Sequence, residues 1–153
     1  MIIDAHVHLA RELTGFRAPL RHGKVVDGET VSQWFPPSFD PPASPPETLL
    51  GYMDDAGVDR AIIVQHHLYG DQNETTLEAV RRWPARFDGY AYLGGFDRPD
   101  DADRLQGLLA AGLLGLKVEL ASTRRLRPSF RFDGDHEWAI WARLNRLRRP
   151  LAL

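Results

Sequence analysis

Residues 44–65, with the sequence SPPETLLGYMDDAGVDRAIIVQ, contain a helix signal followed by a strand signal. Ser44, two prolines and Glu47 form a capping-box pattern, which predicts a helix with Ser44 as its N-cap. Gly57 follows the last apolar position, where glycine commonly ends a helix. Residues 61–64 form an unbroken apolar run, which is typical of a strand buried on both faces in a parallel sheet.

The same alternation extends in both directions along the chain. Further strands are predicted at residues 2–7, 88–94, 114–120 and 150–153, and further helices at residues 73–83, 99–111 and 137–148, the last capped by Asp135. This order predicts an α/β fold with a parallel sheet and crossover helices. A (β/α)8 TIM barrel takes about 250 residues, so we expect only about the first four to five βα units here. The sequence ends inside an apolar run, which indicates the N-terminal part of a longer barrel; an open sheet is the alternative.

Composition excludes several classes of protein. The chain has no cysteine, which excludes disulfides and thiolate metal sites and is typical of a cytoplasmic protein. Its net charge of −2 gives no overall attraction to nucleic acid or to an anionic membrane. We find neither a signal peptide nor an apolar run of the roughly 20 residues that span a bilayer. The arginine-rich residues 124–149 are interpreted as a solvated surface, with an anion-binding patch as the alternative.

The residues Asp4-Ala5-His6-Val7-His8 stand at the carboxyl end of the first predicted strand. Strand side chains alternate, so Asp4, His6 and His8 should share one face. Imidazole nitrogens bind divalent metals, and ligands of parallel α/β folds bind beyond the carboxyl ends of strands. We therefore predict that His6 and His8 bind a metal ion and that Asp4 orients one of them. The alternative is that both histidines merely end a strand.

Lys117 and Glu119 share one face of the strand predicted at residues 114–120. A charged side chain inside a barrel is costly unless it is paired or bound to a metal. Both residues are therefore candidates for catalysis or for completing the metal site. The alternatives are a self-neutralising Lys–Glu pair and a contact with substrate.

His66 and His67 follow the strand that contains residues 61–64. Because neighbouring strand residues face opposite ways, at most one of the two should enter a pocket. We take His67, together with Tyr69, as a candidate for substrate binding, against the alternative of ordinary polar loop residues. Asp71 or Asn73 is expected to cap the next helix.

Residues 9–43 show no clean periodicity and are rich in proline, glycine and aromatic residues. An irregular segment of this length in a compact domain is usually functional or disordered. Since it follows the first strand, we predict an active-site loop or lid in which Trp34, Phe35 and Phe39 exclude water.

Several stretches resemble one known family. MIIDAHVHL, residues 1–9, resembles the first strand of the amidohydrolase superfamily, and GLLGLKVEL, residues 112–120, resembles its fourth. Residues 44–97, with AGVD, YGDQN and PARF, are similar to amidohydrolase-related (family 2) proteins, which include lactonases and decarboxylases. The resemblance implies a barrel in which His6 and His8 hold a catalytic divalent ion, Zn or Mn. It also implies further ligands on later strands, beyond residue 153.

The resemblance implies a metal-dependent hydrolase that attacks an ester, lactone or amide carbonyl with an activated water. Some relatives use a carbamylated lysine or a glutamate as an additional ligand, which agrees with the candidacy of Lys117 and Glu119. The alternatives are a non-oxidative decarboxylase and a non-catalytic half-barrel that associates through its sheet edges. The expected partners are a small-molecule substrate and a second copy in a homo-oligomer, and neither nucleic acid nor a membrane.

Overall fold

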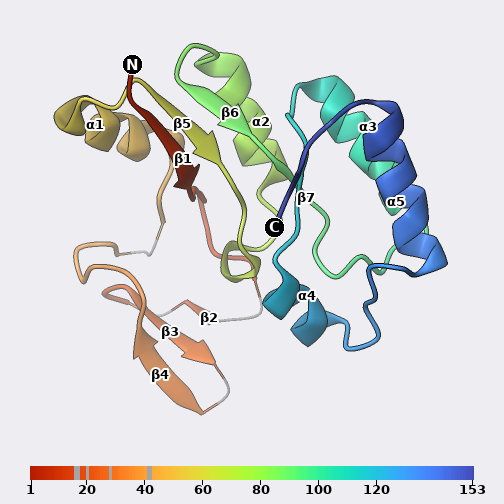
Figure 1. Cartoon of the computed structure of the whole chain (residues 1–153). Coiled ribbons are helices and arrows are strands. Elements are labelled where there is room, and N and C mark those ends of the chain that lie inside the picture. The colour runs from red at the N-terminus through yellow and green to blue at the C-terminus, as the bar shows by residue number, and fades with distance from the viewer. Residues whose placement is uncertain (16–17, 20, 28, 41–42) are drawn as a thin grey trace.

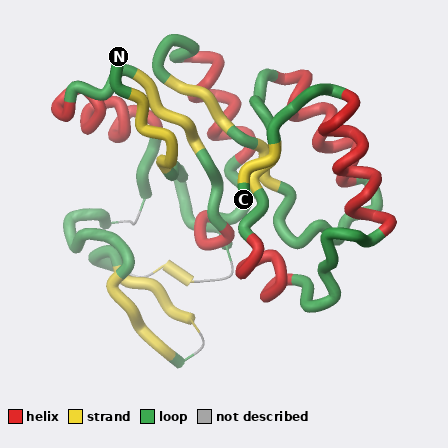
Figure 2. The backbone as a smooth tube through the Cα atoms, in the orientation of Figure 1, coloured by secondary structure: helices red, strands yellow, loops and turns green. Residues whose placement is uncertain are grey.

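The computed structural model describes residues 1–15, 18–19, 21–27, 29–40 and 43–153. Its parallel strands, in chain order, are β1 (Ile3–Val7), β5 (Arg60–Ile63), β6 (Phe87–Gly89), β7 (Ala91–Tyr92), β8 (Leu116–Lys117) and β9 (Leu151–Ala152). One sheet has the order β1-β5-β6 and another the order β7-β8-β9. Figure 2 shows these strands side by side, flanked by helices. The predicted alternation of strands and helices is confirmed.

β6 and β7 are two parts of one strand, interrupted at Tyr90. The Tyr90 N–H donates to the Ile63 carbonyl on one side (2.9 Å), and the Ala91 N–H donates to the Gly115 carbonyl on the other (2.8 Å). The two sheets therefore follow one another in the order β1, β5, β6–β7, β8, β9 (Figure 1). The strand expected at residues 88–94 is present, with a break that its apolar pattern does not predict.

The connecting helices are α1 (Pro46–Ala56), α2 (Asn73–Arg82), α3 (Asp101–Ala111) and α5 (Asp135–Arg146). Gly57 ends α1 with a φ of 68°, a left-handed conformation that glycine adopts at little cost. The predicted capping box is wrong, because Pro45 is the N-cap of α1 and no side chain caps it. The Ser44 backbone instead exchanges two hydrogen bonds of 2.9 Å with Ala10, in an isolated antiparallel bridge.

The fourth strand is shorter than predicted and leads into a helix. β8 ends at Lys117, and α4 (Leu120–Leu126), which the sequence pattern did not predict, follows it. Glu119 is the N-cap of α4, and its carbonyl accepts from the Thr123 N–H (2.8 Å). The alternation in residues 114–120 is too short to fix where the strand ends. The start of α5 also differs, since its N-cap is Gly134 and not Asp135.

Residues 9–43 contain regular structure that the sequence pattern did not predict. β2 (Ala18–Pro19), β3 (Lys24–Asp27) and β4 (Thr30–Gln33) form a small antiparallel sheet, which Figure 1 shows apart from the parallel strands. Its strands are too short for an alternating pattern to stand out. The Gln33 amide donates to the carbonyls of His22 (2.7 Å) and Phe35 (2.6 Å), which ties β4 to the adjoining turns.

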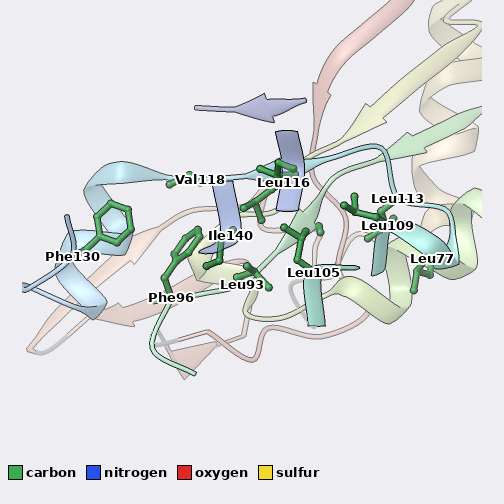
Figure 3. Close-up of a cluster of buried hydrophobic side chains, with 12 residues drawn as sticks. Leu77, Leu93, Phe96, Leu105, Leu109, Leu113, Leu116, Val118, Phe130 and Ile140 are labelled. Atoms are coloured by element: carbon green, nitrogen blue, oxygen red, sulfur yellow. The ribbon is translucent and has the colours of Figure 1, made fainter. Parts of the chain in front are cut away.

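Three clusters of buried apolar side chains stabilise the fold, since burial of apolar surface is the dominant favourable term in folding. The largest packs α3 and α5 against β7 and β8, and Figure 3 shows members such as Leu105, Leu116 and Ile140. A second lies between α1, α2 and the strands β1 and β5. The third joins Ala10, Leu13, Val25 and Phe35 to Leu68, which follows β5 in the chain. This third cluster holds the small sheet next to the carboxyl ends of the parallel strands.

Both outer strands have an unpaired edge among the described residues. β1 pairs with β5 alone, and β9 pairs with β8 alone. Ile2 and Ile3 are 58% and 46% exposed, and Leu153 is 69% exposed. The parallel sheet is therefore open on both sides. Of the helices that the structure describes, none combines the length and the apolar character needed to cross a bilayer.

Candidate active site

His6 and His8 lie together at the carboxyl end of β1. Their ring centroids are 4.9 Å apart and the rings are nearly perpendicular, at 89°. The register of β1 with β5 shifts between Asp4 and Val7, so strict alternation from Asp4 to His8 does not hold. The Asp4 carboxylate accepts from the backbone N–H of His6 (3.1 Å). Its expected role of orienting an imidazole is therefore not seen among the described contacts.

The ring of His8 is oriented by the neighbouring strand. Its Nδ1 lies 2.8 Å from the Val64 carbonyl oxygen, which only accepts hydrogen bonds. We therefore assign the proton to Nδ1, so that Nε2 carries the lone pair that can bind a ligand. Burial lowers the pKa of His8, and the nearby His6 and His66 lower it further, against the opposite effect of the Val64 hydrogen bond. The neutral form, which metal binding requires, is favoured.

Glu119 lies against two adjacent histidines. Its Oε1 is 3.0 Å from His66 Nε2, and its Oε2 is 2.9 Å from His67 Nδ1. One ligand atom from each of these three residues lies within 4.8 Å of the others, a spacing that could hold a metal ion. His66 Nδ1 accepts from the Leu68 N–H (3.1 Å), so a neutral His66 carries its proton on Nε2, facing Glu119. Both carboxylate oxygens are thereby oriented.

Both adjacent histidines contact Glu119, although neighbouring residues of a strand face opposite ways, while only His67 lines the pocket described below. β5 ends at Ile63, and the short 3-10 helix η1 (His67–Tyr69) begins soon after it. Strand alternation has therefore stopped before these residues. Their ring centroids are 4.0 Å apart. His66 is a site residue that sequence reasoning passed over, and its only signal was its place just after a buried strand.

The histidines of β1 and those beside Glu119 form one continuous site. The His8 ring centroid lies 5.8 Å from that of His66 and 5.4 Å from that of Tyr69. The Tyr69 ring in turn lies 5.9 Å from Phe35, which packs on Phe39 at 6.2 Å. Phe35 and Phe39 belong to residues 9–43, which we predicted to form a loop or lid. They pack next to the site through the ring of Tyr69.

Lys117 and Tyr92 lie side by side on β8 and β7. They are partners in the parallel register, and they are 9% and 5% exposed. Burial raises the pKa of Tyr92, and the carboxylates of Glu119 and Asp71 raise it further. The phenol therefore stays protonated, within electrostatic reach of both acids. A buried ammonium such as that of Lys117 favours a nearby negative charge.

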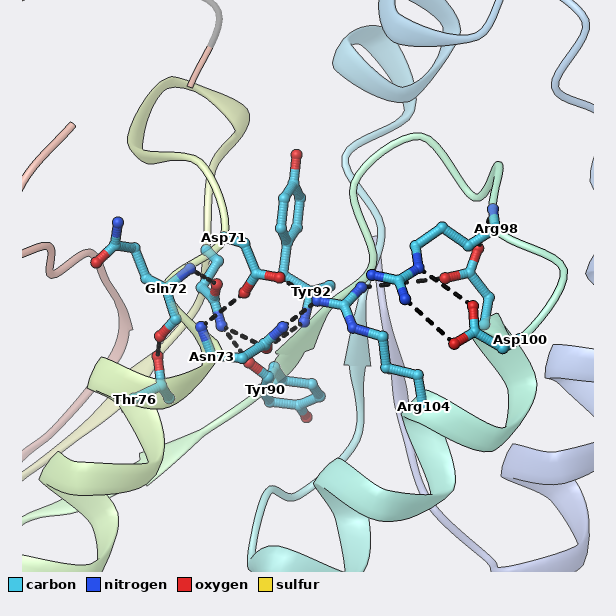
Figure 4. A network of polar contacts seen from close by, with 11 residues as sticks. Asp71, Gln72, Asn73, Thr76, Tyr90, Tyr92, Arg98, Asp100 and Arg104 are labelled. Atoms are coloured by element: carbon cyan, nitrogen blue, oxygen red, sulfur yellow. Dashed lines mark hydrogen bonds and ion pairs between the residues drawn. The ribbon is translucent and has the colours of Figure 1, made fainter. Parts of the chain in front are cut away.

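A network of buried amides fixes the turn that carries the histidines. Gln65 Nε2 donates to Asn73 Oδ1 (3.0 Å), and Gln65 Oε1 accepts from the Gln72 N–H (2.9 Å). Asn73 Nδ2 donates to the Tyr92 carbonyl (2.8 Å), while Asn73 Oδ1 accepts from the Tyr92 N–H (2.9 Å), as Figure 4 shows. The Asn73 side chain thus makes the pair of backbone hydrogen bonds to Tyr92 of β7 that a neighbouring strand would otherwise make. The expected cap at Asp71 or Asn73 is wrong, because Gln72 is the N-cap of α2 and no side chain caps it. The Asp71 Oδ1 accepts from the Asn73 N–H (2.9 Å) just before the helix.

Residues 14–15 pack directly on this turn. The Thr14 N–H donates to the Tyr69 carbonyl (3.1 Å). A Cβ atom at Gly15 would lie 2.0 Å from the His67 carbonyl oxygen, so only glycine fits there. Both residues line a pocket of about 420 Å³ that also includes His67. A substrate in this pocket would touch the same histidine that contacts Glu119.

The model of a protein family described as Amidohydrolase matches residues 3–153. No match was found among curated proteins. One similar solved structure is a probable 2-pyrone-4,6-dicarboxylic acid hydrolase from Acinetobacter baumannii with citric acid bound, at 15% identity and a TM-score of 0.63, covering 98% of this chain and 48% of that chain. A 2,6-dihydroxybenzoate decarboxylase from Rhizobium has 17% identity and a TM-score of 0.59, with coverage of 98% and 48%. A 5-carboxyvanillate decarboxylase from Novosphingobium aromaticivorans with bound manganese has 21% identity and a TM-score of 0.54, with coverage of 67% and 32%.

At these identities the likeness to solved structures shows the fold alone. It confirms the prediction of a partial (β/α)8 barrel with about the first four to five units. The chain spans about half the length of the structures that it matches over nearly all its residues, at 48% and 49% of those chains.

Proposed function

Because the chain belongs to the amidohydrolase family, we propose that it carries part of the active site of a metal-dependent hydrolase that acts on an ester, lactone or amide carbonyl. One observation carries this proposal: His6, His8 and His66 converge with Glu119 beyond the carboxyl ends of three parallel strands. Active sites of (β/α)8 barrels are built at that end.

We assign His6 and His8 as ligands of a divalent ion, with Glu119 as a candidate third ligand. Imidazole nitrogens and a carboxylate oxygen suit both Zn and Mn. The Val64 carbonyl holds the His8 ring as outer contacts commonly hold metal-binding histidines. When bound, such an ion polarises a carbonyl and lowers the pKa of a water. Zn is the first choice, and the manganese in the 5-carboxyvanillate decarboxylase structure supports Mn as the alternative.

Where another residue completes the ligand set of the ion, Glu119 is instead the candidate proton acceptor. His66 and His67 face its two oxygens at 3.0 and 2.9 Å, which fixes the direction of the carboxylate. A carboxylate held in this way can take a proton from the attacking water. Lys117, two residues earlier on β8, would stabilise negative charge that develops on the carbonyl oxygen. His67 and Tyr69 are assigned to substrate binding, because His67 lines the adjacent pocket and Tyr69 packs against His8.

A non-oxidative decarboxylase of an aromatic or unsaturated acid is the second candidate. Two of the three similar structures named above are decarboxylases, one of them with manganese bound. The same metal ligands would serve this reaction, with a protonated group delivering a proton to the carbon that loses carbon dioxide. Lys117, two residues before Glu119, and its register partner Tyr92 are the candidate proton donors.

Substrate profiling distinguishes the two candidates. The protein, expressed from its complete gene and loaded with Zn or Mn, is assayed with a panel of lactones for acid release and with hydroxybenzoates for carbon dioxide release. Glu119→Gln should lower the observed reaction by about 100-fold or more. Glu78→Gln, on a side chain 41% exposed and paired with Arg11 at the surface, is the matched control and should retain activity. Absence of both reactions with either metal would contradict the proposal.

A further inference from the structure

α4 connects the candidate site to a second, buried contact at its other end. Glu119, which contacts His66 and His67, is the N-cap of α4, and Arg127 is its C-cap. We propose that Arg127 is a positioning residue that fixes the place of Glu119 through α4. This inference rests on the proposed function, which assigns Glu119 to the reaction, and it adds a residue outside the site that controls its geometry.

α4 is too short to be stable by itself. It has seven residues, whereas an isolated helix shorter than about 12–15 residues is marginal in water. Among the described residues, no side chain caps its first turn. Leu120 and Leu126 are 37% and 44% exposed, and Figure 1 shows α4 apart from α3 and α5. The contacts at its two ends therefore decide where α4 lies.

Two backbone hydrogen bonds join the two ends of α4. The Thr123 N–H donates to the Glu119 carbonyl (2.8 Å), and the Arg127 N–H donates to the Thr123 carbonyl (2.8 Å). Thr123, between them, is 2% exposed, which keeps this line of hydrogen bonds against the interior of the protein. A displacement of Arg127 is therefore passed to the backbone of Glu119 over about two turns of helix.

The guanidinium of Arg127 binds two other segments of the chain. Its Nη1 donates to the Phe96 carbonyl, in the loop after β7, and forms an ion pair of 2.7 Å with Glu137 Oε1, in the first turn of α5. Glu137 is 1% exposed, and a buried carboxylate is costly unless it is paired. The protein therefore gives up this contact only at a cost, which holds the end of α4 in one place.

The backbone at Phe96 is strained where it meets Arg127. The φ of Phe96 is 56°, in the left-handed region that a bulky residue rarely adopts. Such a conformation persists only where the surrounding structure fixes it. Phe96 is 1% exposed, and its ring packs on Phe130 (5.4 Å between centroids) and Trp141 (5.9 Å) in the buried cluster of Figure 3. Arg127 thus binds a carbonyl whose position is itself fixed by packing.

The test removes the Arg127 contact without leaving a buried charge. Arg127→Gln alone would leave Glu137 unpaired in the interior, which threatens the fold. It is therefore combined with Glu137→Gln in one double variant, in which the shorter glutamine side chain cannot reach both partners of the arginine. The matched control is the Arg131→Gln/Asp133→Asn double variant, which removes an ion pair in the next loop whose side chains are 72% and 64% exposed.

All variants are made in the protein expressed from its complete gene and loaded with Zn. The imidazole ¹⁵N NMR shifts of His66 and His67 report their contact with the Glu119 carboxylate, and Glu119→Gln supplies the shifts of the altered contact. In the Arg127 double variant we expect these shifts to move toward those of Glu119→Gln. Amide hydrogen exchange at residues 120–126 should become about 10-fold faster, and kcat should fall about 10-fold at unchanged KM. The control should keep the original values.

Unchanged imidazole shifts or unchanged exchange of α4 in the folded double variant would overturn the inference. If the double variant does not fold, Arg127→Lys replaces it: lysine keeps the charge beside Glu137 but lacks the planar fork of donors, so the same changes should appear at smaller size, and their absence would overturn the inference. Neither the shifts nor the exchange depends on turnover. The expected changes in a protein without hydrolase or decarboxylase activity would support the role of Arg127 and contradict the proposed function.

Discussion

Glu119 Oε1 and His66 Nε2 lie 3.0 Å apart, although one residue follows β8 and the other follows β5. The contact connects the start of α4 to the turn at η1 across the intervening strand. Since the Leu68 N–H fixes the proton of a neutral His66 on Nε2, the ring presents a donor to the carboxylate. We therefore propose that His66 is a positioning residue for Glu119.

Removing this donor should impair turnover more than substrate binding. We expect His66→Phe to lower kcat by about 10- to 100-fold with little change in KM, as for other residues that hold a metal-site group. His66→Gln, which keeps an N–H donor, should recover part of the loss. Steady-state kinetics of both variants test this, and a larger change in KM than in kcat would contradict the positioning role.

Asn73 should contribute more to stability than any surface asparagine. It is 3% exposed, and its side chain bonds both the N–H and the carbonyl of Tyr92 as well as Gln65. Asn73→Ala leaves those buried groups unsatisfied, so we expect a loss of about 2–4 kcal/mol in the free energy of unfolding. Urea unfolding measures the loss, with the exposed Asn145→Ala as a control that should change by less than about 0.5 kcal/mol. Equal effects of the two substitutions would refute this account of the network.

Asp101 should make stability depend on pH in an uncommon direction. It is fully buried, and among the described residues its Oδ1 has no hydrogen-bond partner. Burial raises the pKa of Asp101 above 3.8, against the opposing contacts with Arg98 and His136. A carboxyl with a raised folded pKa stabilises the protein below the unfolded pKa, and this contribution is lost as pH rises through the folded pKa.

We therefore expect Asp101→Asn to raise the free energy of unfolding at pH 7, and the difference from the unchanged protein to shrink as pH falls toward 4. Urea unfolding at a series of pH values measures this, with the exposed Asp97→Asn as the control. A variant that is less stable at pH 7, by an amount that does not change with pH, would show that the contacts of Asp101 outweigh its burial.

The open edge of β1 should promote association of the 153-residue chain when it is expressed alone. Ile3 lies on this edge and is 46% exposed. A lysine there discourages strand pairing, so Ile3→Lys should shift sedimentation toward the monomer. Tyr52→Lys, at a helical position 53% exposed, should not. A chain that is already monomeric would contradict the half-barrel assembly considered from the sequence.

Much of the fold could be predicted because apolar periodicity is a local property. The apolar residues 61–64 correctly predicted a strand, which is β5. Gly57 correctly predicted the end of a helix, which is α1. α4 and the small antiparallel sheet were missed, since their short elements leave no clear pattern. The prediction that Ser44 caps α1 was wrong, because the Ser44 backbone pairs with that of Ala10. These two residues are far apart in the sequence, so a local pattern cannot predict their contact.

The candidate site could be predicted only where it depends on one strand. His6 and His8 were found because they lie two residues apart at a strand end. His66 was passed over because strand alternation was extended beyond Ile63, where β5 ends. The role of Asn73 depends on the packing of α2 beside β7, which spacing along the chain does not reveal.

The most direct test of the central claim is the metal content of the protein expressed from its complete gene. Elemental analysis compares purified samples of the unchanged protein, the His6→Ala/His8→Ala double variant and a control variant, His22→Ala. The His22 side chain is 64% exposed and lies 3.4 Å from Asp40, away from the site. The account predicts near-stoichiometric Zn or Mn in the unchanged protein and in His22→Ala, and its loss in the double variant. Metal retained in the double variant, or absent from a correctly folded unchanged protein, would contradict the account.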